Sequence, residues 1–183
     1  MISGEKRGGE SIWIGVDDTD SRKGGCTTYV AYRLILKLIR NGYCIIGYPR
    51  LVRLNPNIPW KTRGNGAIAL QVRREGEKPI QIGENQGKKI YAYREGAEEV
   101  DVSEIKNIVE EEVVSHMREE ENTNPGFVIL EEQPPYEVYK KTIHEIVRLE
   151  EIEEKLSALH GYWNGFGNKR GLIGATAAVS WRP

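Results

Sequence analysis

A short apolar run that ends in a cluster of aspartates constrains this chain more than any other feature. Residues 12–16 read Ile-Trp-Ile-Gly-Val, and Asp17-Asp18-Thr19-Asp20-Ser21 follows at once. A continuous apolar run of this length is typical of a strand that is covered on both faces. Three carboxylates within four residues would repel one another at the end of such a strand. We therefore expect a cation to gather there, most simply Mg²⁺ together with a phosphate ester.

The aspartate cluster has a functional and a purely structural interpretation. Open α/β sheets bind their ligands just beyond the carboxyl ends of strands, and hard oxygen ligands favour Mg²⁺ over zinc. Asp17, Asp18 and Asp20 are therefore candidate metal ligands, and Asp17 and Asp18 are also candidate catalytic residues. The structural alternative is an ordinary Asx turn. Asp20 in particular could instead cap or orient the loop that carries Thr27.

The segment Gly24-Gly25-Cys26-Thr27-Thr28 precedes a strongly periodic helical pattern. Glycines before a helix start leave free backbone N–H groups that favour anions. Thr27 and Thr28 place hydroxyls in the first turn, where a threonine either caps the helix or binds or accepts a phosphoryl group. Spacing alone does not separate these roles. A carboxylate cluster that faces a glycine-rich helix start predicts a site for a metal-bound nucleotide.

Composition excludes several classes of protein. The 183 residues are 39% apolar and 29% charged, which is ordinary for one soluble globular domain. No apolar run approaches the roughly 20 residues of a membrane-spanning helix, so we expect a cytoplasmic protein without membrane contact. We interpret residues 1–10 as a disordered or non-native extension and residues 11–183 as the domain. Cys26 and Cys44 lie in no zinc-binding spacing, so no structural zinc is expected.

The remaining patterns predict one α/β domain, with α+β as the alternative, in which a mixed sheet is covered by about four helices. Helical spacing of apolar residues predicts helices at 28–40, 103–121, 136–147 and 149–159. Strands are predicted at 12–16, 43–54, 67–72 and 127–130, with a hairpin at 80–82 and 89–93 after a charged turn at 73–79. Residues 161–171 are predicted to be an extended glycine-rich loop, and 172–181 a segment of small residues.

Basic residues flank a loop that prolines make rigid. Residues 55–60 read Asn-Pro-Asn-Ile-Pro-Trp and cannot continue a sheet, because proline lacks the backbone N–H. Gly64-Asn65-Gly66 permits close approach of a ligand to the backbone, and Trp60 is either a core residue or a platform for a base. The cations that could bind phosphate here, rather than line a solvated strand edge, are Arg50, Arg53, Lys61 and Arg63.

A second glycine-rich loop lies near the end of the sequence. Gly165-Phe166-Gly167-Asn168-Lys169-Arg170-Gly171 resembles a phosphate loop but matches neither GxGxxG nor GxxxxGK[ST]. Its candidate phosphate-binding residues are Gly167, Asn168, Lys169, Arg170 and Gly171.

Long stretches of the chain resemble a known family of enzymes. They are residues 16–21 (Val-Asp-Asp-Thr-Asp-Ser), 25–29 (Gly-Cys-Thr-Thr-Tyr), 49–67 around the rigid loop, and 165–175 with a Gly-Asn-x-Arg-Gly segment. These stretches are similar to the archaeal tRNA(Ile) 2-agmatinylcytidine synthetases, and in particular to their atypical kinase domain. The motifs are long and unusual, so chance is a poor explanation.

The resemblance implies an ATP-dependent ligase that acts on tRNA with Mg²⁺. In that family, the 2-oxo group of the wobble cytidine in an isoleucine tRNA with a CAU anticodon is phosphorylated. Agmatine then displaces the phosphorylated oxygen and forms agmatidine, which allows the codon AUA to be read as isoleucine. ATP ends as AMP and two phosphates, and the enzyme phosphorylates a threonine of its own Cys-Thr-Thr segment. By position, that threonine is Thr27, and the Mg²⁺ ligands are Asp17 and Asp18, with Asp20 as a further candidate.

The chain departs from that family at its end. Family members continue into ferredoxin-like, OB-type and zinc-ribbon parts that help hold tRNA, whereas this sequence stops at Pro183. We therefore expect the kinase domain of a longer protein.

Two other interpretations stay open. A HAD-like, Mg²⁺-dependent phosphatase or phosphotransferase would share the Asp-x-Asp form of Asp18-Thr19-Asp20, although Arg22 stands where that family has a hydroxyl residue. A non-catalytic RNA-binding module would use the basic first half, in which residues 1–94 hold 17 Lys and Arg against 8 Asp and Glu.

Overall fold

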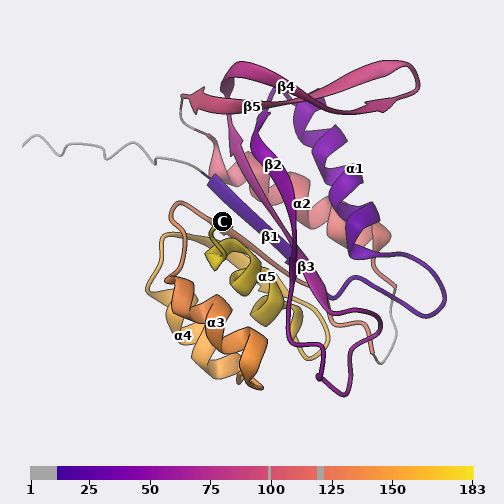
Figure 1. Ribbon diagram of the computed structural model, residues 1–183, viewed down its shortest axis with the longest axis vertical. Coiled ribbons are helices and arrows are strands. Elements are labelled where there is room, and N and C mark those ends of the chain that lie inside the picture. Colours follow the sequence, from indigo (N-terminus) through magenta and orange to yellow (C-terminus); the bar gives the residue numbers. More distant parts are fainter. Residues whose placement is uncertain (1–11, 99, 119–121) are drawn as a thin grey trace, which may run out of the picture.

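A seven-stranded mixed sheet forms the centre of the fold, with helices on both of its faces (Figure 1). The computed structural model describes residues 12–98, 100–118 and 122–183, and the extension expected at residues 1–10 lies outside these ranges. The elements in chain order are β1 (Ile12–Asp17), α1 (Thr27–Arg40), β2 (Cys44–Arg53), β3 (Gly66–Arg73), β4 (Glu75–Asn85), β5 (Lys88–Ala97), α2 (Val102–His116), β6 (Gly126–Leu130), α3 (Tyr136–His144), α4 (Leu149–Ser157), β7 (Gly161–Gly165) and α5 (Gly171–Ser180).

The strand that carries the aspartates lies deep inside the sheet. The strand order is β4-β5-β2-β3-β1-β6-β7, and all neighbouring pairs are antiparallel except β2 and β5. Successive side chains of β1 point to opposite faces. Ile12, Ile14 and Val16 pack on the face covered by α1 and α2, whereas Trp13 packs on the face covered by α5. Asp17 continues the row of Trp13 and therefore emerges beside α5.

Helix α5 is the main difference from the sequence-based prediction, which left residues 172–181 without an element. Nine of its ten residues are buried, and it packs against β1, β3 and β6. A helix that is buried on almost every side has no polar face, so its sequence carries no amphipathic period. Small residues let it approach the sheet closely: a Cβ on Gly15 would overlap the carbonyl of Ala175.

The strands at the two edges of the sheet were also underestimated. Residues 161–165, predicted to be part of a loop, form β7, because each of them pairs with β6 in the register Gly161↔Leu130 to Gly165↔Gly126. The predicted hairpin exists but is longer, and residues 75–79 of the charged turn expected at 73–79 already belong to β4. Gln86 and Gly87 make its tight turn, with φ of 51° and 76°.

The expected fold class and single domain are confirmed, and the described residues form five helices where about four were expected. Helix α3 ends at His144, three residues earlier than expected, and the connection that follows it, residues 145–148, becomes part of the site. Within the described ranges, no helix is both long and apolar enough to cross a membrane.

Candidate functional site

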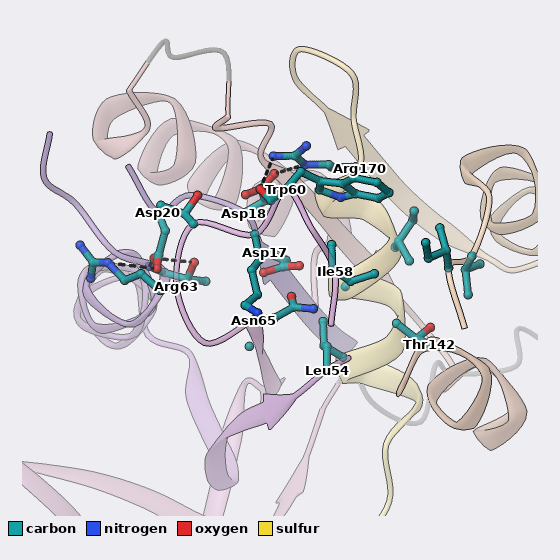
Figure 2. Close-up of a pocket in the computed structure, with 18 of the residues that line it drawn as sticks. Asp17, Asp18, Asp20, Leu54, Ile58, Trp60, Arg63, Asn65, Thr142 and Arg170 are labelled. Atoms are coloured by element: carbon teal, nitrogen blue, oxygen red, sulfur yellow. Dashed lines mark hydrogen bonds and ion pairs between the residues drawn. The ribbon is translucent and has the colours of Figure 1, made fainter. Parts of the chain in front are cut away.

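A pocket opens where β1 ends, and segments from distant parts of the chain surround it (Figure 2). The loop between β2 and β3 forms one wall, α5 and the loop before it form another, and the connection between α3 and α4 closes the far end. The residues that line it are Asp17, Asp18, Asp20, Thr27, Leu54, Ile58, Trp60, Lys61, Thr62, Arg63, Asn65, Gly66, Thr142, Glu145, Ile146, Val147, Arg170, Ile173 and Gly174.

Asp17 sits at the floor of the pocket against helix α5. Its carboxylate lies so close to Gly174 that a Cβ on this glycine would overlap Oδ2. No cation pairs with Asp17 at salt-bridge distance in the described part of the chain. Burial, and then the neighbouring Asp18 carboxylate, raise the pKa of Asp17 to about 8. A bound cation would remove the cost of ionising this group, so Asp17 fits a metal ligand.

Asp18 is fixed by the late glycine-rich loop and by the start of β6. Its Oδ2 accepts hydrogen bonds from Arg170 Nε at 3.0 Å and from the backbone N–H of Asn124 at 3.1 Å. Its backbone is in the left-handed region, with φ of 54°, so the chain turns sharply after the strand. Burial raises the pKa of Asp18, and the Arg170 guanidinium opposes that rise.

Asp20 binds the first residue of helix α1, Thr27, whereas the N-cap residue itself is Cys26. The Oδ1 of Asp20 accepts from the backbone N–H of Thr27 at 2.6 Å and from Thr27 Oγ1 at 3.2 Å. The Thr27 hydroxyl also accepts a hydrogen bond from Thr19 Oγ1 at 3.1 Å. Thr27 is only 4% exposed but lines the pocket. Thr28 does not: its exposed hydroxyl lies 3.1 Å from Cys26 Sγ.

The structure brings two of the four predicted cations of the β2–β3 region to the pocket. Arg63 lies 3.7 Å from Asp20 and donates to the carbonyl of Gly25 at 3.2 Å. Lys61 lines the pocket while its Nζ donates to the carbonyl of Pro56. Two residues of the glycine-flanked segment, Asn65 and Gly66, line the pocket as well.

The other two cations point elsewhere. Arg50 stacks on Trp13 and Trp181, with 4.9 and 5.6 Å from its guanidinium carbon to the ring centres, and burial lowers its pKa. Arg53 donates to the carbonyl of Gly64 at 3.4 Å and does not line the pocket. Neither residue is placed to bind a ligand in the pocket.

Only one residue of the late glycine-rich loop reaches the pocket, and it is Arg170. The loop itself is built on Asn124, whose Oδ1 accepts from the backbone N–H of Asn168 at 2.9 Å. Lys169 is turned toward Glu153, 4.0 Å away. Gly167 and Gly171 pack so closely on residues 124–126 that a Cβ on either would overlap them. These glycines shape the loop rather than contact the pocket.

The three aspartates do not converge as a ready-made metal cage. Among the residues that the structure describes, no group of three or more His, Cys, Asp or Glu side chains is arranged to hold a metal. Mg²⁺ is usually held by only one or two carboxylates, together with substrate phosphates and water. Asp17 fits that requirement, and so does Asp18, because both of its contacts fall on Oδ2. Both oxygens of Asp20 are engaged, Oδ1 by Thr27 and Oδ2 by Arg63.

Sequence reasoning missed the apolar side of the pocket. Leu54, Ile58, Val147 and Ile173 line it together with Ile146. The α3–α4 connection reaches the site only because α3 packs on α5, and no local motif signals such a contact. The only available sign was the rigid loop, in which an isoleucine stands between two prolines.

The site is of the kind that binds phosphate compounds. It combines carboxylates at a strand end, a helix start and guanidinium groups from two loops. This is a mixed α/β domain whose pocket suits a metal-bound phosphate compound. Comparison with known families is more specific. The chain belongs to the TiaS TCKD domain family, whose model matches residues 13–163. This membership does not fit the HAD-like alternative.

Similar proteins share this domain over nearly all of the present chain. A tRNA(Ile2) 2-agmatinylcytidine synthetase TiaS of Thermoplasma volcanium is 40% identical, over 93% of this chain and 38% of that protein. A crystal structure of a TiaS-tRNA(Ile2)-ATP complex matches with a TM-score of 0.75 and 33% identity, over 94% of this chain and 36% of that one. A TiaS-tRNA(Ile2)-AMPCPP-agmatine complex matches with a TM-score of 0.72 and 32% identity, over 93% and 36%. The chain spans just over a third of the length of these proteins.

Proposed function

We propose that this chain is the ATP- and Mg²⁺-dependent kinase domain of an enzyme that makes agmatidine in tRNA. Its target is the wobble cytidine of an isoleucine tRNA with a CAU anticodon, and its second substrate is agmatine. One observation carries the proposal: in a TiaS TCKD family member, Asp17, Asp18, Thr27 and Arg170 line a single pocket. Relatives that have been crystallised with tRNA(Ile2), ATP or its analogue, and agmatine support it.

The proposed reaction at the base has two steps, and phosphorylation of Thr27 breaks a second P–O bond of ATP, so that AMP remains. A phosphoryl group passes from ATP to O2 of the cytidine, so that one P–O bond of ATP breaks and a new P–O bond to the base forms. The primary amine of agmatine then attacks C2, and phosphate leaves with the former 2-oxo oxygen while the amine loses a proton. Phosphorylation is needed because the oxygen of a cytidine carbonyl is a poor leaving group.

The residues of this chain serve these steps in distinct ways. Asp17 and Asp18 would hold Mg²⁺, which supplies charge neutralisation for the phosphates when bound. Arg170 and Arg63, on opposite sides of the aspartates, would neutralise the remaining phosphate oxygens. Since Asp20 Oδ1 lies 3.2 Å from Thr27 Oγ1, Asp20 is placed to accept the hydroxyl proton when Thr27 is phosphorylated. We further propose that the reaction takes place in the cytoplasm, on tRNA.

The test is self-phosphorylation of the purified chain. After incubation with Mg-ATP, intact-mass and peptide mass spectrometry should find one phosphoryl group on Thr27. The variant Thr27→Val should lose it, whereas the matched control Thr28→Val, one residue along the same turn, should keep it. Mg²⁺-dependent binding of ATP should be measured in parallel. A chain that is neither phosphorylated nor binds Mg-ATP, but binds RNA in a salt-sensitive way, would favour the RNA-binding module instead.

A further inference from the structure

The pocket has two chemically different halves. One half holds the aspartates with Arg63 and Arg170, and it suits phosphates. The other half is apolar and is built by Leu54, Ile58, Trp60, Ile146, Val147 and Ile173. Figure 2 shows Leu54, Ile58 and Trp60 on the side of the pocket away from Asp20 and Arg63. A ligand that fills both halves must combine a phosphate with an apolar body.

Two large apolar side chains that line the apolar half are exposed to solvent and are not part of the hydrophobic core. Trp60 is 41% exposed and Ile146 is 60% exposed, although both are large and apolar. They come from the β2–β3 loop and the α3–α4 connection, which lie far apart in the sequence. Exposed apolar side chains that line one pocket indicate a ligand with apolar faces. An indole ring is a good platform for stacking a nucleobase.

The polar groups in this half restrict which base would fit. The Thr142 hydroxyl donates to the carbonyl of Val138, and the Asn65 amide donates to the carbonyl of Asn55. Glu145 is exposed, and its carboxylate makes no hydrogen bond or ion pair within the described part of the chain, so it is available to a ligand in the pocket. A carboxylate only accepts hydrogen bonds. It therefore matches an exocyclic amino group and repels a keto oxygen at the same position.

We propose that the apolar half of the pocket is a slot for a nucleobase that carries an exocyclic amino group, which is either adenine or cytosine. Trp60 and Ile146 form its walls, and Glu145 accepts the amino group. This inference rests on the proposed function, which supplies both sources of such a base: the adenine of ATP and the cytosine of the RNA target. Glu145 is thus a specificity residue, which makes no contact with the transferred phosphate.

The experiment compares bases that differ at one group. Dissociation constants are measured by calorimetry for Mg-ATP against Mg-ITP, which has a keto oxygen in place of the amino group. In a second arm, anticodon stem-loops with CAU or UAU are compared in the presence of a non-hydrolysable ATP analogue. The variants are Trp60→Ala and Glu145→Gln, with Glu150→Gln as the control, because Glu150 is an exposed acid close by that does not line the pocket.

The slot predicts a preference for the amino base in one of the two arms. Glu145→Gln should reduce that preference about tenfold, since glutamine can also donate to a keto oxygen, and Glu150→Gln should leave it unchanged. Trp60→Ala should weaken binding in the same arm about tenfold. A preference in the ATP arm assigns the slot to adenine, and one in the RNA arm assigns it to cytosine.

Two negative results have different meanings. If Mg-ATP binds but neither variant changes either preference, the slot is wrong and the proposed function stands. If the wild-type chain shows no Mg²⁺-dependent binding of triphosphate at all, the proposed function and the slot fail together.

Discussion

Arg170 and Asp18 join two loops that lie 152 residues apart, through a hydrogen bond of 3.0 Å from Nε to Oδ2. The same guanidinium donates to the carbonyl of Asn122 at 2.7 Å, and the backbone N–H of Asn124 donates to the same carboxylate oxygen. Asp18 is therefore oriented from two sides before any ligand arrives. Arg170 has two functions in consequence, because it fixes Asp18 and adds positive charge to the pocket.

Removing the guanidinium should destabilise the domain. The side chains of Arg170 and Asp18 are only 19% and 14% exposed, so Arg170→Ala leaves a mostly buried carboxylate without its partner. We expect a loss of about 2–3 kcal/mol in the free energy of unfolding, measured with urea. The neighbouring variant Lys169→Ala removes an exposed cation and should change stability by less than about 0.5 kcal/mol. Equal effects of the two substitutions would contradict this role of the ion pair.

The sequence identified both residues of this pair as candidates but did not predict their contact. Asp18 follows a strand whose apolar run is unmistakable, and Arg170 belongs to a loop rich in glycine, so both were candidates. Their contact depends on β7 and α5, which bracket the loop and were not predicted. Both elements owe their form to packing, since β7 pairs only with β6 in the described sheet and α5 is buried on nearly every side.

The basic strand residues show a second limit of sequence reasoning. Arg50 and Arg53 looked equivalent to Lys61 and Arg63, because all four flank one loop. The register of β2 against β3 shifts between Ile46 and Arg50, however. This irregularity turns Arg50 onto the two tryptophans and away from the pocket. A bulge changes which face a residue occupies, and its only local signs here are Gly47, with φ of 65°, and Pro49 within the strand.

Substitutions of Asp20 should distinguish its hydrogen bond to the start of helix α1 from its proposed role as a proton acceptor. Asparagine keeps an oxygen that can accept from the backbone N–H of Thr27, so Asp20→Asn should change stability by less than about 0.5 kcal/mol. The asparagine amide is a much weaker base than a carboxylate, so the rate of phosphorylation of Thr27 should fall at least about tenfold. Asp20→Ala should lose the hydrogen bond as well as the base, and its free energy of unfolding should fall by about 1 kcal/mol. Urea unfolding and timed mass spectrometry measure the two effects, and a fully active Asp20→Asn variant would exclude the role as proton acceptor.

Substitutions at Gly174 and Asp17 should have non-additive effects on the free energy of unfolding. A Cβ at this position would overlap Asp17 Oδ2, so Gly174→Ala should cost about 1–3 kcal/mol and displace the carboxylate. In the double variant with Asp17→Ala, the overlap with the carboxylate is gone and part of the cost should disappear. A double-mutant cycle by urea unfolding should give an interaction free energy of at least about 1 kcal/mol. Additive effects would show that the overlap with Leu54, which also lies close to Gly174, dominates instead.

The raised pKa of Asp17 predicts a pH-dependent difference between the wild-type chain and Asp17→Asn. Because the pKa of Asp17 is about 8 in the folded state and near its ordinary value of 3.8 when unfolded, the folded wild type holds an extra proton between these values. Its stability therefore falls as pH rises through this window, relative to a variant that cannot ionise. Asp17→Asn should gain about 1–3 kcal/mol over the wild type between pH 5 and pH 8 in a chelating buffer.

Magnesium should reverse that difference if Asp17 is one of its ligands. At pH 8, adding Mg²⁺ with ATP should stabilise the wild type more than Asp17→Asn, because binding to the folded state alone adds to its stability. Unfolding curves with and without Mg-ATP provide the measurement. Asp20→Asn is the matched control, since it also removes one carboxylate from the pocket lining but not one of the two proposed metal ligands. A wild type that Mg-ATP stabilises no more than Asp17→Asn would remove Asp17 from the proposed metal site and leave Asp18 as its remaining carboxylate.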